Sequence, residues 1–160
     1  MSNGGMMAYR LAVEMPRRFA AIASVAGVTF LEKPEPKSPT PILHIHGTRD
    51  PLVPFEGTKE GGGPYRFPAI EESLKLWCKV NGCSETPETT VVESKHDKLK
   101  VVRKDYRTGK EKAPVILYVV HGGGHTWPGI DRHARFLGEN THNINANDLL
   151  WDFFRQFTLK

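Results

Sequence analysis

Strand-sized apolar segments alternate along this chain with segments of helical periodicity, and this alternation restricts the possible folds more than any other feature. None of the apolar runs approaches the roughly 18 residues that a membrane-spanning helix needs. Such alternation is typical of an α/β fold, in which helices cover a mainly parallel sheet. The predicted helices cover residues 6–15, 68–80 and 147–157, and the predicted strands cover residues 19–28, 42–46, 89–93, 99–106 and 115–120.

The length and composition indicate one domain. A chain of 160 residues has the size of a single domain, and its 39% hydrophobic and 25% charged residues allow a packed core. The N-terminus has no basic stretch followed by an apolar one, so we expect no signal peptide. Cys78 and Cys83 are too few for a disulfide scaffold or a zinc ribbon, and they either form one local bridge or are both reduced.

The formal net charge of +4 is concentrated in one segment. Residues 95–112 contain eight Lys or Arg and three Asp or Glu, which leaves the rest of the chain almost neutral. Nucleic-acid-binding proteins usually combine such a cluster with aromatic residues or a recognisable motif, and only Tyr106 lies within this one. Lysines commonly protect edge strands. We therefore interpret the segment as a solvated hairpin with charged strands and expect neither a nucleic-acid nor a membrane partner.

Three polar loops carry the candidate chemistry. Ser2-Asn3-Gly4-Gly5 comes directly before the first predicted helix and looks like the right-hand part of G-x-S-x-G, the strained turn that exposes a nucleophilic serine. We expect the glycine of this pattern to be needed because a side chain would collide with the tight turn. Asp50 lies in residues 46–54 (HGTRDPLVP), straight after a predicted strand, where parallel sheets gather active-site groups. His125 lies in the glycine-rich loop of residues 122–129 (GGGHTWPG), after the strand at 115–120.

The order of these three residues indicates more than each does alone. Taken singly, Ser2 is an unremarkable terminal serine, Asp50 is a turn residue before proline, and His125 is a structural histidine. Ser, then Asp, then His is the chain order of α/β-hydrolases, and it differs from the orders of chymotrypsin and subtilisin. We therefore predict a triad of nucleophile Ser2, acid Asp50 and base His125 that meets at one edge of the sheet, with His125 in the middle.

The same residues resemble a known family. Residues 2–7 (SNGGMM), residues 46–54, the helix end from Trp77 to Cys83 and the GGGHTWPG loop together are similar to the polyhydroxybutyrate depolymerase-like esterases, α/β-hydrolases grouped with feruloyl and acetyl-xylan esterases. The resemblance covers essentially the whole chain. It implies a serine esterase that uses no cofactor or metal and forms an acyl-enzyme with polyhydroxyalkanoate-type, feruloyl or acetyl esters. Relatives of this kind are often exported, which implies an extracellular location for a full-length protein.

The resemblance also implies a missing part. Members of the family carry an N-terminal half, with the first five sheet strands and one oxyanion-hole donor, ahead of the serine. In this chain the backbone N–H of Asn3 is the candidate donor. Trp127 is a candidate substrate-stacking residue or, equally, a packed anchor of its loop. We therefore expect residues 1–160 to be the C-terminal half of an α/β-hydrolase domain, without its N-terminal strands.

Three other interpretations use the same residues. A serine peptidase of the prolyl-oligopeptidase type shares an acid loop like HG-x-x-D-x-x-V-P, but the GGGHTWPG loop favours the esterase. A non-catalytic half-domain, truncated or paired with a separate N-terminal partner, is the second. The third is a metal hydrolase, but zinc needs a third ligand and an ordered second shell, and the spacing shows no third partner. Its candidate ligands are His44, His46, His121 and His125.

Overall fold

The computed structural model describes residues 1–160 except 61–63, 108–112, 132–133 and 160. Within these residues, five strands form one sheet in the order β1-β2-β5-β4-β3, and the expected α/β class is confirmed. The elements follow one another as α1 (Asn3–Glu14), β1 (Ile22–Val25), β2 (Ile42–Gly47), α2 (Ile70–Asn81), β3 (Glu88–Val92), β4 (Val101–Asp105), β5 (Val115–Val120), the short 3-10 helix η1 (Arg135–Leu137) and α3 (Ala146–Phe154).

The sheet is mixed. β1, β2 and β5 are parallel to one another, whereas β4 is antiparallel to both β5 and β3. The expectation of a mainly parallel sheet is therefore not confirmed. The physical reason is that β3, β4 and β5 follow one another along the chain, and short connections between neighbouring strands permit only antiparallel pairing.

The described residues of the charged segment, 95–107, belong to this antiparallel part. They contain most of the β3–β4 connection and β4, which forms the expected hairpin with β3. Solvated strands are confirmed only for the edge strand β3, because β4 lies between β5 and β3 and its residues Val101, Val102 and Asp105 are buried. The turn predicted at residues 107–110 lies largely outside the described residues.

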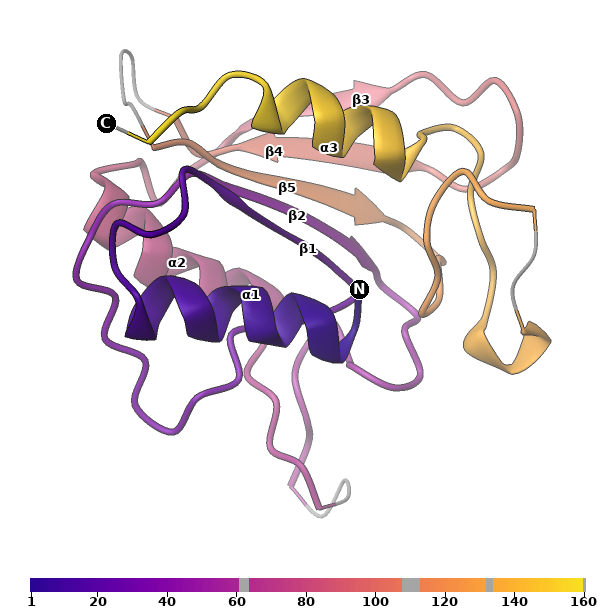
Figure 1. Cartoon of the computed structure of the whole chain (residues 1–160). Helices are drawn as coiled ribbons and strands as arrows, with labels where there is room; N and C mark the ends of the chain where they lie inside the picture. Colours follow the sequence, from indigo (N-terminus) through magenta and orange to yellow (C-terminus); the bar gives the residue numbers. More distant parts are fainter. Residues whose placement is uncertain (61–63, 108–112, 132–133, 160) are drawn as a thin grey trace.

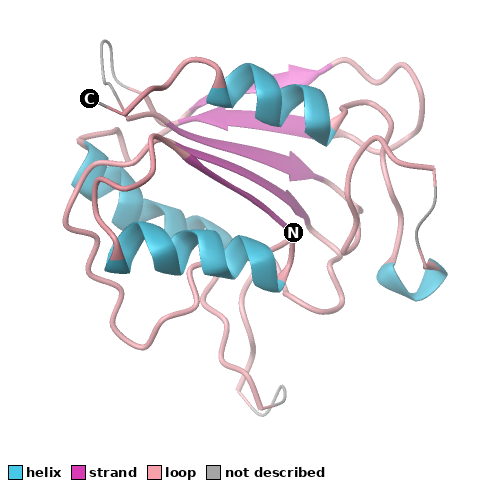
Figure 2. Cartoon of the chain, in the orientation of Figure 1, coloured by secondary structure: helices cyan, strands magenta, loops and turns pink. Residues whose placement is uncertain are grey.

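Helices cover both faces of the sheet, with α1 and α2 on one face and α3 on the other (Figures 1 and 2). The alternation of side chains along the strands produces this arrangement. Leu117 of β5 belongs to the same buried cluster as Trp77 of α2. Its neighbours Ile116 and Tyr118 belong to the cluster of Phe153 on α3. All six residues of β5 are buried. Because helices cover both faces of this strand, its side chains are apolar without the usual alternation with polar ones.

Several boundaries differ from the sequence-based ones. α1 begins at Asn3 rather than at residue 6, so the two glycines after Ser2 lie inside the helix. β1 covers only Ile22–Val25, because the backbone turns at Ala26, where φ is 52°. α3 ends at Phe154, three residues before the predicted end. None of the helices in the described part of the chain is long and apolar enough to cross a membrane.

Candidate functional site

The loops that follow β2 and β5 bring Asp50 and His125 together. Gly47 at the end of β2 is in register with Val120 at the end of β5, so both loops leave the sheet at the same edge. His125 Nδ1 lies 2.8 Å from Asp50 Oδ2, and the two side chains are 5% and 0% exposed. The order of the residues and their positions after parallel strands predicted this contact.

Asp50 is a fully hydrogen-bonded carboxylate. Its Oδ1 accepts from the N–H groups of Leu52 and Val53, each at 2.8 Å. Its Oδ2 faces His125 Nδ1 and, at 3.4 Å, His46 Nε2. Burial acts to raise the pKa of this carboxyl group, but the hydrogen bonds, led by that of His125, outweigh burial and hold the pKa well below its ordinary value. A charged Asp50 is suited to hold the imidazole in the Nδ1–H tautomer, which leaves Nε2 to take a proton.

The loop that carries His125 is packed against two other segments. A Cβ at Gly124 would lie 2.0 Å from the carbonyl oxygen of Leu137, so only glycine allows this approach. The His125 N–H donates to that same oxygen at 2.6 Å. On the other side, the N–H of Arg49 donates to the Gly123 oxygen at 2.9 Å, which joins the loop to the one that follows β2. The glycines therefore fix the backbone of His125 relative to Asp50.

Ser2 lies at the same edge of the sheet, beside the end of β1. Its N–H donates to the Val25 oxygen at 2.8 Å, and Figure 1 shows the N-terminus at this end of β1. Ser2 has φ 51° and ψ −125°, a strained combination for a residue with a side chain. A strained serine directly before a helix matches a nucleophile elbow. No hydrogen bond joins Ser2 to His125 within the described residues, so their convergence stays a prediction.

The expected collision of a side chain with the tight turn after Ser2 stays a prediction. Beyond its own turn of helix, a Cβ at Gly4 would meet nothing within 4 Å. A Cβ at Gly5, in contrast, would lie 2.3 Å from Ser24 Oγ on β1. Gly5 is therefore the residue that lets the first turn of α1 lie close to the sheet.

The chain is similar to esterases along most of its length. It is 37% identical to the protein named "Putative esterase NocK" of Nocardia uniformis subsp. tsuyamanensis, over 95% of the chain and 48% of that protein. It is 28% identical to feruloyl esterase B of Piromyces equi over 79% of the chain. It is also 23% identical to the bifunctional acetylxylan esterase/xylanase XynS20E of Neocallimastix patriciarum over 99% of the chain.

These relatives support an esterase family. The chain spans about half the length of NocK and 20% of each of the other two proteins. No protein-family model matches the chain. The narrower grouping with polyhydroxybutyrate depolymerases stays a prediction.

The backbone N–H of Asn3, the predicted oxyanion-hole donor, is at the start of α1. The first N–H groups of a helix have no partner within the helix. Among the residues that the structure describes, none accepts a hydrogen bond from this N–H. It is therefore available for a developing negative charge beside Ser2.

Trp127 is held in place by contacts with α3. Its Nε1–H donates to Asn147 Oδ1 at 3.1 Å at the start of α3, and its partly buried ring packs against the cluster of Phe153. These contacts give Trp127 the role of an anchor between its loop and α3. Substrate stacking by Trp127 stays a prediction.

The four histidines considered as metal ligands do not gather around one point where an ion could bind. His121 is exposed, His125 contacts Asp50, and both ring nitrogens of His44 and of His46 have hydrogen-bond partners. The described part of the chain contains no group of three or more His, Cys, Asp or Glu side chains that could hold a metal ion.

Sequence reasoning missed the residue that connects α1 to this site. The hydroxyl of Tyr9 on α1 lies 2.7 Å from His44 Nδ1. His44 and His46 are two positions apart in a strand and therefore share one face of β2, but no sequence signal placed Tyr9 beside them.

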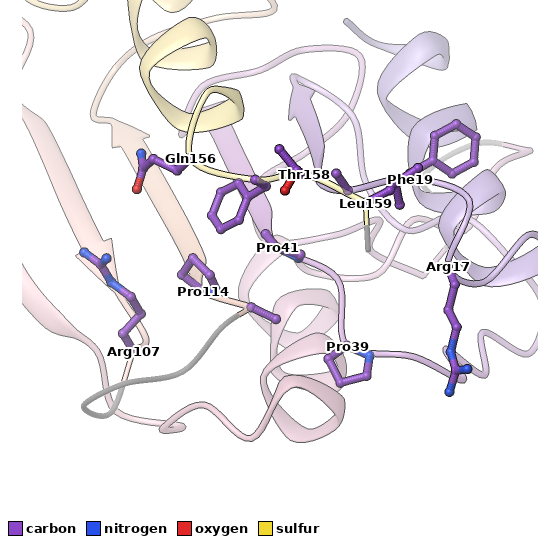
Figure 3. Close-up of a pocket in the computed structure, with 12 residues that line it drawn as sticks. Arg17, Phe19, Pro39, Pro41, Arg107, Pro114, Gln156, Thr158 and Leu159 are labelled. Atoms are coloured by element: carbon purple, nitrogen blue, oxygen red, sulfur yellow. The ribbon is translucent and has the colours of Figure 1, made fainter.

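A cavity of about 690 Å³ lies at the opposite edge of the sheet (Figure 3). Its lining includes Pro41 and Pro114, which come just before β2 and β5, together with Arg17, Arg107 and Phe157. Asp50 and His125 follow the other ends of the same strands, so this cavity is separate from the candidate active site.

Proposed function

We propose that this chain is the C-terminal half of an α/β-hydrolase esterase domain, with Ser2 as nucleophile, His125 as general base and Asp50 as its acid. The observation that carries the proposal is the buried contact of 2.8 Å between His125 Nδ1 and Asp50 Oδ2. The strained backbone of Ser2 at the same sheet edge supports it, as do the names of the relatives. The match to 48% of NocK supports the half-domain.

The proposed reaction is acyl transfer in two steps. His125 Nε2 takes the proton of Ser2 as Oγ attacks the ester carbonyl carbon, and charged Asp50 stabilises the imidazolium. The N–H of Asn3 donates to the oxyanion, and a second donor comes from the N-terminal half. His125 then protonates the leaving alcohol and activates the water that hydrolyses the acyl-enzyme. Every group in this scheme is a protein group, so the reaction needs no cofactor.

The proposed substrates are esters of feruloyl or acetyl groups or of polyhydroxyalkanoates. The names of two relatives, a feruloyl esterase and an acetylxylan esterase, support the first two classes. The resemblance to esterases that are often exported supports an extracellular location for a full-length protein, and we propose that it acts there.

The test joins this chain behind the N-terminal half of NocK and measures hydrolysis of p-nitrophenyl acetate and methyl ferulate. We expect Ser2→Ala and His125→Ala each to lower kcat by about 10⁴-fold or more, because neither proton transfer nor acyl-enzyme formation can proceed. The chain without the added half should be at least about 10²-fold slower, because one oxyanion donor is lost.

The matched control is His121→Ala, which removes an exposed histidine four residues earlier in the same loop. It should keep kcat near the value of the unaltered fusion. Unchanged turnover in His125→Ala would contradict the proposal, and activity that chelators abolish while Ser2→Ala retains it would favour the metal hydrolase.

A further inference from the structure

A chain of buried hydrogen bonds runs from α1 to the candidate acid. The Tyr9 hydroxyl lies 2.7 Å from His44 Nδ1, and His44 Nε2 lies 3.0 Å from His46 Nδ1. His46 Nε2 lies 2.9 Å from the Val53 oxygen and 3.4 Å from Asp50 Oδ2. Tyr9, His44 and His46 are each at most 1% exposed, so water does not compete for these contacts.

The Val53 carbonyl determines where the protons of this chain lie. A carbonyl oxygen only accepts, so His46 Nε2 must carry a hydrogen. If His46 is neutral, its Nδ1 accepts from His44 Nε2–H, and His44 Nδ1 accepts from the Tyr9 hydroxyl. This arrangement gives every donor one acceptor.

The two other arrangements of these hydrogens each leave a buried group without a suitable partner. With hydrogens on both Nδ1 atoms, the lone pair of His46 Nε2 would face the Val53 carbonyl and the Asp50 carboxylate, which repel it. With His46 doubly protonated, the Tyr9 hydroxyl would have to accept from His44. Its own hydrogen would then be buried without an acceptor among the described residues. The surroundings of His44 agree with a neutral ring: burial first, and then the neighbouring His46, lower its pKa well below the ordinary value.

We propose that His46, held in the Nε2–H tautomer by Tyr9 and His44, is a positioning residue that directs one oxygen of Asp50 toward His125. The catalytic part of this inference rests on the proposed esterase function. Asp50 Oδ2 faces both His125 Nδ1 and His46 Nε2. Asp50 Oδ1 accepts hydrogen bonds from two backbone N–H groups. Rotation of the carboxylate would break contacts at both oxygens, so the N–H of His46 adds to the restraint on its orientation.

The first experiment reads protonation without any need for activity. Long-range ¹H–¹⁵N correlation spectra of the chain distinguish the tautomers and the charged form of each imidazole. We expect neutral Nε2–H rings for His44 and His46 and a protonated Nδ1 for His125. In Tyr9→Phe, His44 Nδ1 loses the hydroxyl that donates to it. Its ¹⁵N resonance should therefore move toward the value of an imidazole nitrogen that accepts no hydrogen bond. A hydrogen on Nδ1 of His46 would overturn the proposal, whether it accompanies the one on Nε2 or replaces it.

The second experiment compares two replacements of His46. Gln can present an N–H near the place of Nε2, whereas Met fills similar space without a donor. In the NocK fusion we expect His46→Met to lower kcat at least about tenfold with little change in KM, the size expected for one hydrogen bond to a charged group. His46→Gln should keep most of kcat. In the chain alone, we expect the hydrogen-bonded Nδ1–H of His125 to give a ¹H signal that weakens in His46→Met and persists in His46→Gln.

The two readouts separate this inference from the proposed function. If the fusion hydrolyses no ester, the proposed function fails, and the spectra still decide whether His46 positions Asp50. If the His125 Nδ1–H signal and kcat in His46→Met equal those of the unaltered protein, the positioning role is wrong. The tautomers of the unaltered chain provide a test even if His46→Met does not fold.

Discussion

At the scale of single residues, buried histidine makes stability depend on pH. His44 is 1% exposed, and its pKa lies well below the ordinary value because of burial and of the adjacent His46. In the unfolded chain the same residue binds a proton with a pKa of about 6.5. The unfolded state therefore binds more protons than the folded state below about pH 6.5, and stability falls as the pH falls through that range.

We expect the free energy of unfolding to decrease from pH 7 to pH 5, with a contribution from His44 that approaches about 1.4 kcal/mol per pH unit. Asp50 does not contribute in this window, because a carboxyl group with a lowered pKa affects stability only below about pH 5. Urea denaturation at a series of pH values measures the slope. His44→Gln should flatten it, and His142→Gln, which changes an exposed histidine, should not. An equal slope in both variants would contradict this assignment.

At the scale of elements, the contact between α1 and β1 depends on one of two adjacent glycines. A Cβ at Gly5 would lie 2.3 Å from Ser24 Oγ and 3.2 Å from Ser24 Cβ, whereas one at Gly4 would meet nothing within 4 Å. Ser24 itself is buried, and its Oγ has no hydrogen-bond partner in the part of the chain that the structure describes. The hydroxyl is therefore the main obstacle at this contact and is not held by any bond.

We expect Gly5→Ala to lower the free energy of unfolding by about 1–3 kcal/mol through overpacking. Gly4→Ala, its matched control, should leave stability unchanged or raise it by up to about 1 kcal/mol, since alanine favours helix. In a double-mutant cycle, Ser24→Ala should recover part of the loss in Gly5→Ala, because it removes the atom that clashes. Equal stabilities of Gly4→Ala and Gly5→Ala would show that the helix does not approach β1 as closely as described.

At the scale of the whole molecule, β1 leaves one edge of the sheet uncovered. The N–H groups of Ile22 and Ala26 donate toward β2, so the N–H groups of Ala23 and Val25 face the other way. At that edge the N–H of Ser2 occupies the Val25 oxygen, but no described strand pairs with β1 there. An open, apolar strand edge is a template for pairing with another chain.

The isolated chain is therefore expected to self-associate as its concentration rises, which size-exclusion chromatography with light scattering would detect. Ala23→Pro should reduce association, because it removes an N–H of the open edge and leaves the hydrogen bonds to β2 in place. Val91→Lys on β3, the strand at the other edge, is the control and should have little effect. A monomer at all concentrations, or an equal effect of both variants, would contradict an association through β1.

Periodicity and chain order were enough to predict the classes of element and the contact between Asp50 and His125 in the candidate site. Alternating apolar and helical periods predicted three helices and five strands of the described chain, because side-chain burial follows the period of each element. The chain order also predicted the contact of Asp50 with His125. Both residues come just after parallel strands, and the carboxyl ends of such strands meet at one edge.

Features that depend on how distant segments approach each other could not be predicted from the sequence. The mixed strand order, the contact of Gly5 with Ser24 and the packing of Trp127 on α3 are of this kind. So is the hydrogen bond between Tyr9 and His44, which are 35 positions apart. Periodicity shows which face of an element is buried, but not which atom of a neighbouring element lies against it. Hydrogen bonds and close packing depend on distances of tenths of an ångström, and these exist only once the helices are seated on the sheet.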